Sequence, residues 1–179
     1  MKFCEAARDG LIKQPANSFS NLAFAIAGII LIFHSLKDTG KKNLMTSSGF
    51  YPIVMSCVLI LLSAGSFAMH ATNAFWGGFA DLFTMFLIAS FISGYSLTKV
   101  FNWKFSTFSI YFIVTVVINS AIFVSKYNQF GFVLSIVEFT FMAQVLLTIF
   151  LEIYAYFFIN KNINLNYGLL CVGALITAF

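Results

Sequence analysis

The sequence predicts an all-α fold, a bundle of helices embedded in a membrane. Hydrophobic residues make up 60% of the 179 positions and charged residues only 9%, against roughly 45–50% and 25% in a soluble domain. Phenylalanine alone occupies 24 positions. A soluble fold of this size cannot bury so much apolar surface, which excludes a water-soluble enzyme. The sequence also lacks a basic stripe, so we expect no nucleic-acid partner and take the lipid bilayer as the surroundings of the chain.

Six apolar segments have, or nearly have, the roughly 20 residues that a membrane-crossing helix needs. They cover residues 19–36, 50–70, 75–98, 105–124, 130–158 and 165–179. The connections are short and polar, so we expect residues 1–179 to form a single multi-pass domain. The sixth segment would give about 22 Å of helix, which is shorter than the roughly 30 Å hydrocarbon core. We therefore expect the natural chain to continue into a seventh helix.

The distribution of basic residues and the N-terminal sequence indicate how the chain is oriented in the membrane and which membrane holds it. Residues 1–17 are polar, and no small-residue cleavage site follows the first apolar run, so we expect no cleavable signal peptide. Pro15 directly precedes that run, where a missing N–H costs little. Six basic residues on one side against four on the other favour an N-terminus that faces away from the cytoplasm. The short loops favour a bacterial inner membrane over an internal eukaryotic membrane.

Polar side chains at membrane depth mark the candidate site. Such groups are costly in lipid, so each needs a partner or a function. Ser66 and His70 share one face of the second segment, since they are four residues apart. Asp81 lies in the third segment, and counting from the turn near Thr72 and Asn73 places it at the same depth as Ser66, on the order of 10–12 Å into the membrane.

Two interpretations of Ser66, His70 and Asp81 remain open. Imidazole is a common zinc ligand, a neighbouring carboxylate can take a proton from water, and a hydroxyl can stabilise an oxyanion. The alternative is a His–Asp hydrogen bond that locks two helices together. His34 lies at the opposite end of its own segment, so this sequence offers a single histidine ligand at the site.

Several other polar residues are candidates for a supporting network. Asn17 and Asn21 are one helical turn apart and could cap the first helix or bond to a neighbouring one. Glu5 is either a surface acid or a partner of that N-terminal network. Glu138 lies deep in the fifth segment, where a carboxylate is a functional candidate or a helix–helix hydrogen bond. One face of the same segment carries Gln144, Thr148 and Glu152.

Three stretches of the sequence resemble the alkaline ceramidase family, integral membrane hydrolases grouped with the progestin and adipoQ-type receptors. The first is Phe3-Cys4-Glu5 followed by residues 15–24, Pro-Ala-Asn-Ser-Phe-Ser-Asn-Leu-Ala-Phe. The second is residues 65–72, Gly-Ser-Phe-Ala-Met-His-Ala-Thr, and the third is residues 81–85, Asp-Leu-Phe-Thr-Met. The order and spacing of these motifs are similar to those of the family.

The resemblance implies seven transmembrane helices and a zinc-dependent amidase that cuts ceramide into a fatty acid and a sphingoid base. It assigns His70 as a zinc ligand and Asp81 as the group that orients or deprotonates the attacking water. Ser66 would assist at the metal site or the oxyanion. The family's other two ligands belong to a His-x-x-x-His near the last helix, which we expect beyond residue 179.

This sequence departs from the family pattern at two places. Family members that bind calcium carry acidic and amide side chains near the N-terminus, where this chain keeps Glu5 but has Lys2, Ala7 and Gln14. We therefore expect no calcium site. Leu82 replaces a frequent glutamate, which would alter the pocket but removes no ligand.

Three functions stay open on the sequence alone. A zinc-dependent membrane amidase acting on ceramide or a similar lipid amide is favoured, because the motifs include the residues that carry the chemistry. A receptor-like or scaffold member of the same superfamily would lack hydrolysis. A small transporter would use Asp81 and Glu138 to carry protons, yet the broken helices and paired repeats typical of transporters are not evident in the sequence.

Overall fold

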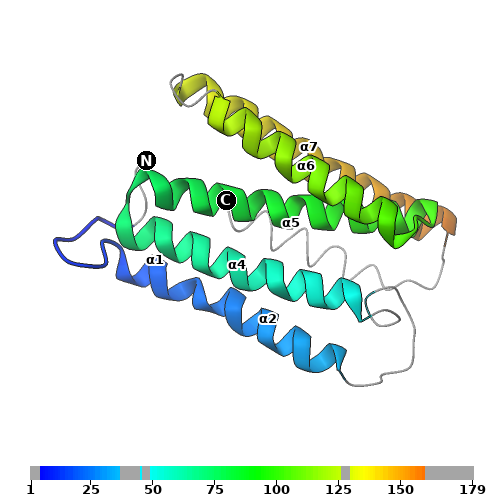
Figure 1. The fold of residues 1–179 in the computed structure, drawn as a ribbon, viewed down its shortest axis with the longest axis horizontal. Coiled ribbons are helices and arrows are strands. Elements are labelled where there is room, and N and C mark those ends of the chain that lie inside the picture. Colours follow the sequence, from blue (N-terminus) through cyan, green and yellow to red (C-terminus); the bar gives the residue numbers. More distant parts are fainter. Residues whose placement is uncertain (1–4, 37–44, 46–48, 126–129, 160–179) are drawn as a thin grey trace. The chain divides into compact units, whose positions relative to one another are not determined.

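The computed structural model describes residues 5–36, 45, 49–125 and 130–159, and every regular element among them is helical, preceded by an irregular segment at residues 5–14. The predicted all-α class is confirmed there. The elements in Figure 1 are α1 (Pro15–Ser20), α2 (Leu22–Ser35), α4 (Phe50–Thr72), α5 (Phe75–Phe101), α6 (Phe105–Ser125) and α7 (Phe130–Tyr154), the last continued by a π-helical turn, Ala155–Ile159.

Four helical stretches are long and apolar enough to cross a membrane. They are Pro15–Ser35, which combines α1 and α2, then Phe50–Thr72, Phe75–Phe101 and Phe105–Val124. The predicted fifth segment also forms a helix, α7, but its crossing of the membrane stays a prediction. The predicted sixth segment and a seventh helix lie outside the described residues. The expected six or seven crossings are therefore supported for four helices.

The chain divides into two compact units within α5, residues 1–88 and 89–179. In the first unit α2 packs along α4, and α1 packs near the C-terminal end of α4. Gly28 makes the packing of α2 on α4 close, because a Cβ there would lie 2.9 Å from the carbonyl oxygen of Ser56. The second unit contains the end of α5 with α6 and α7.

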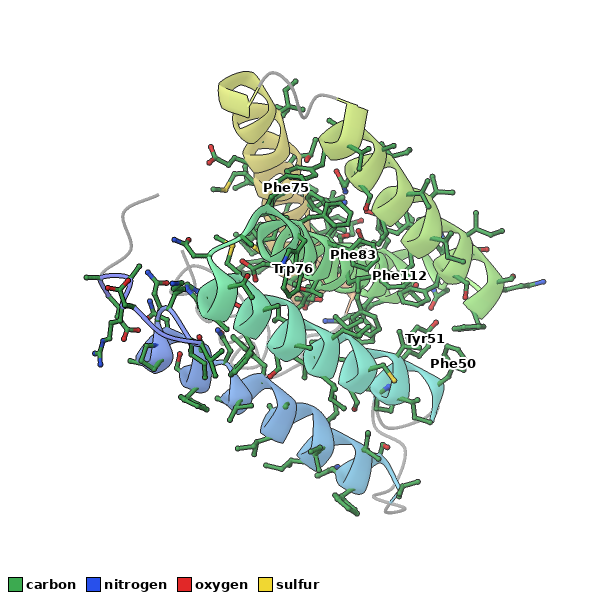
Figure 2. The ribbon with its side chains drawn as sticks, turned by 60° about the vertical axis from the view of Figure 1, so that its left-hand side comes forward. Phe50, Tyr51, Phe75, Trp76, Phe83 and Phe112 are labelled. Carbon is green, nitrogen blue, oxygen red and sulfur yellow. The ribbon has the colours of Figure 1, made fainter. Side chains whose placement is uncertain are left out.

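Aromatic residues flank both ends of α4. Phe50 and Tyr51 begin α4, whereas Phe75 and Trp76 begin α5, directly after the turn at the other end of α4 (Figure 2). Trp76 is 58% exposed. Tryptophan and tyrosine prefer the interface between lipid and water, and the 23 residues of α4 span about 35 Å at 1.5 Å per residue. We therefore infer that the α4–α5 turn lies at one membrane surface.

The α4–α5 turn is tight, and two glycines bring its helices together. Asn73 ends α4 in the left-handed conformation with φ 50°, and its N–H donates to the carbonyl of Met69 at 2.8 Å. A Cβ on Gly65 would lie 2.7 Å from the Ala80 carbonyl oxygen, and one on Gly77 would lie 2.7 Å from that of Ala68. Small residues allow such backbone approach between membrane helices.

Gly65→Ala is expected to lower the free energy of unfolding by about 1–3 kcal/mol, because the added methyl group meets the Ala80 backbone, which cannot move aside, as well as the Thr84 hydroxyl. Reversible unfolding in mixed detergent micelles would measure the change. Gly78→Ala is the matched control, since its Cβ would meet the flexible Sδ of Met69 at 3.3 Å. Equal stability of the two variants would contradict a close approach of α4 and α5 at Gly65.

An ion pair joins α5 to α7 in the second unit. Lys99 Nζ lies 2.6 Å from Glu152 Oε2, and Ser96 donates to Glu152 Oε1 at 2.9 Å. Both charged side chains are 20% exposed. Lys99 directly follows the predicted third segment, residues 75–98, but α5 continues to Phe101. A lysine can remain within this apolar helix because Glu152 neutralises it.

Candidate functional site

Ser66, His70 and Asp81 meet at the α4–α5 hairpin in the first unit. The Ser66 hydroxyl and the His70 ring both lie near enough to the Asp81 carboxylate to interact with it. All three residues are half-buried. Gly65 precedes Ser66, so the close approach of the two helices is what brings the hydroxyl to the carboxylate.

A glutamine from the N-terminal segment holds the His70 ring. His70 Nδ1–H donates to Gln14 Oε1 at 2.7 Å, and Gln14 Nε2 donates to the carbonyl oxygen of Glu5 at 2.7 Å. A carbonyl oxygen can only accept, so the bond to Glu5 fixes which end of the amide faces His70. The neutral ring therefore carries its proton on Nδ1 and a lone pair on Nε2.

Backbone hydrogen bonds fasten the same N-terminal segment to the end of α4. The N–H of Lys13 donates to the carbonyl of Ala71 at 2.9 Å, and the N–H of Gln14 donates to that of His70 at 3.1 Å. The last carbonyls of a helix have no partner within it. The segment supplies those partners and thus covers the end of α4 that carries His70.

Glu5 caps the start of α1. Its Oε2 accepts the N–H of Asn17 at 2.9 Å, and its Oε1 accepts the N–H of Ala16 at 3.3 Å. A carboxylate is favourable at a helix N-terminus because the unpaired N–H groups there carry partial positive charge. Arg8 also lies 3.5 Å from Oε1. Glu5 thus takes part in the N-terminal network, the second of the two roles considered for it.

The two predicted asparagines have local partners. Asn21 lies at the junction of α1 and α2, and its Nδ2 donates to the carbonyl of Asn17 at 2.9 Å. Asn21 is buried and Asn17 is half-buried. Their hydrogen bond steadies the junction that carries the chain from the site into α2, which is a structural role.

The remaining predicted carboxylate belongs to the second unit. Glu138 lies in α7 of the second unit, where it is exposed, and no hydrogen bond or ion pair to it occurs within the described ranges. The face of α7 that carries Gln144, Thr148 and Glu152 is more enclosed. Glu152 bonds Ser96 and Lys99, whereas the buried Oε1 of Gln144 has no hydrogen-bond partner among described atoms.

Sequence reasoning missed the position of Gln14 at the site. Gln14 is 3% exposed and is the N-cap of α1, just before Pro15. A polar residue directly before a proline at N1 signals a helix start, and this signal was available. Its partner His70 is 56 positions away, so no local pattern connects the two residues.

The described residues offer part of a metal-binding donor set. The Nε2 lone pair of His70 and the carboxylate of Asp81 are donor types that zinc accepts. A hydrogen bond on the other ring nitrogen, as Gln14 provides, is the usual companion of a metal-binding histidine. In the part of the chain that the structure describes, no three His, Cys, Asp or Glu side chains form a group that could hold a metal ion. His70 thus fits a zinc site as one of its ligands, with the Asp81 carboxylate beside it as a proton acceptor.

Comparison of the chain with protein-family models, with curated proteins and with solved structures found no match. What can be inferred about function therefore comes from the site residues and from the motifs that contain them. Ser66 and His70 belong to the second of these motifs, and Asp81 opens the third.

Proposed function

We propose that this protein is a metal-dependent membrane hydrolase that cleaves the N-acyl amide of ceramide or a similar lipid, releasing a fatty acid and a sphingoid base. The observation that carries the proposal is the grouping of the Ser66 hydroxyl and the Asp81 carboxylate beside a histidine, His70, whose Nδ1 is held by Gln14. The resemblance of these motifs to alkaline ceramidases supports zinc as the metal. The short connections of the chain favour a bacterial inner membrane.

The depth of the site suits a lipid amide. Asp81 follows Trp76 by five residues, or about 7.5 Å along α5. If Trp76 marks the interface, the carboxylate lies just below it. In an N-acyl lipid the amide joins the headgroup region to the acyl chain, so it lies at this same depth. The scissile bond can reach the site without leaving the bilayer.

Each side chain has a distinct role in this reaction. Zinc, when bound, would polarise the amide carbonyl and make water acidic enough to react near neutral pH. His70 Nε2 would be one of its ligands. Asp81 takes a proton from the attacking water and delivers it to the departing amine. Once Asp81 is protonated, the Ser66 hydroxyl can turn from the carboxyl group to the carbonyl oxygen that gains negative charge.

Removal of the metal tests the proposal. The purified protein in lipid nanodiscs should contain zinc and hydrolyse a fluorescent N-acyl sphingoid amide. A chelator should reduce the rate by about 100-fold or more, since metal catalysis supplies several kcal/mol, and added Zn²⁺ should restore it. Full activity in metal-free protein would refute metal dependence. A protein that contains no metal and hydrolyses no lipid amide would favour the receptor-like or scaffold alternative.

A further inference from the structure

Gln14 uses all of its hydrogen-bonding groups to connect three parts of the first unit. Its N–H donates to the His70 carbonyl, and its own carbonyl accepts the N–H and Oγ–H of Ser18 at 2.9 Å and 2.7 Å. Its side chain joins the Glu5 carbonyl to His70 Nδ1. Because Gln14 is also 3% exposed, its amide has a single orientation available.

This arrangement selects one form of the His70 ring. A free neutral imidazole exchanges its proton between Nδ1 and Nε2, and the hydrogen bond made by one nitrogen decides which form persists. The Gln14 side chain presents an oxygen to Nδ1, and turning the amide over would break the bond to Glu5. The proton is therefore retained on Nδ1.

We propose that Gln14 is a positioning residue that holds the neutral His70 ring with its proton on Nδ1, so that Nε2 is the nitrogen oriented to bind the metal. This inference rests on the proposed function, because a ligand needs positioning only where a metal binds. Neutral Gln14 holds the ring without adding charge, and Glu5 contributes its backbone carbonyl while its carboxylate caps α1. The N-terminal segment thereby becomes part of the metal site without itself touching the metal.

The tautomer of His70 in metal-free protein provides the first test. In protein labelled with ¹⁵N-histidine, the ring signals that disappear in His70→Asn belong to His70. In mildly alkaline buffer wild-type His70 should be protonated on Nδ1, and Gln14→Leu should shift the proton toward Nε2. Gln144→Leu is the matched control and should leave His70 unchanged. An Nε2-protonated His70 ring in wild-type protein overturns the inference.

Zinc affinity provides the second test and separates the inference from the proposed function. Loss of such a partner typically weakens metal binding by about 10–100-fold, so titration with Zn²⁺ should show this decrease in Gln14→Leu and none in Gln144→Leu. Equal zinc affinity in wild-type protein and Gln14→Leu would refute the positioning role of Gln14 but not the proposed function. A wild-type protein that binds no zinc would refute the proposed function, whatever the tautomer of His70.

Discussion

Replacement of His70 is expected to abolish amide hydrolysis while the helices remain folded. The rate in His70→Ala should fall by about 1,000-fold or more, since loss of a metal ligand removes several kcal/mol of transition-state stabilisation. Hydrolysis of the fluorescent lipid amide and the zinc content of the purified variant would measure the effect. Circular dichroism would show whether the helices persist.

Two further variants separate chemistry from structure at His70. His70→Ala also leaves the buried Gln14 Oε1 without its donor, which costs stability by itself. His70→Asn can retain that hydrogen bond, because its side-chain N–H₂ can replace Nδ1–H, yet it supplies no imidazole ligand. His34→Ala is the control, as His34 is exposed near the end of α2. An active His70→Asn variant with unchanged zinc content would exclude His70 as a ligand.

Breaking the ion pair between Lys99 and Glu152 is expected to give the largest loss of stability. Lys99→Met leaves the Glu152 carboxylate without a cation in an apolar bundle. Removing one partner of a fully buried pair costs roughly 3–5 kcal/mol, and the remaining 20% exposure of each side chain reduces our expectation to about 2–4 kcal/mol. Unfolding in mixed micelles would measure the change.

A double substitution tests the cause of that loss. Lys99→Met combined with Glu152→Gln removes both charges and keeps an acceptor for Ser96, so it should recover most of the stability. Lys104→Met, at an exposed lysine just before α6, is the control. A loss no greater than that of the control would mean that the pair contributes nothing to stability.

The fold class could be predicted because a helix that crosses a bilayer must be long and apolar, and such helices give the sequence its apolar composition. The ends of the elements were less predictable. The second and third segments were expected to end at residues 70 and 98, whereas α4 and α5 continue to Thr72 and Phe101. From the sequence alone Lys99 resembles a loop residue, because its partner Glu152 is 53 positions away in the chain.

The candidate site was partly predictable for the same physical reason. Ser66 and Asp81 flank one tight turn at similar distances, so counting helical rise predicts that they lie near one another, and in the structure they are near enough to interact. Gln14 precedes its helix and acts from an irregular segment, where periodicity gives no information. Glu138, which the apolar sequence context places deep in its segment, has an exposed side chain in α7.

The fastening of residues 13 and 14 to the last turn of α4 has a consequence for biosynthesis. The ribosome delivers the N-terminal segment first, but the carbonyls of His70 and Ala71 that it binds exist only after α4 has emerged. The segment can therefore form these hydrogen bonds only after α2 and α4 have been inserted. The surroundings of His70 are therefore complete only in chains in which α2 and α4 have been assembled.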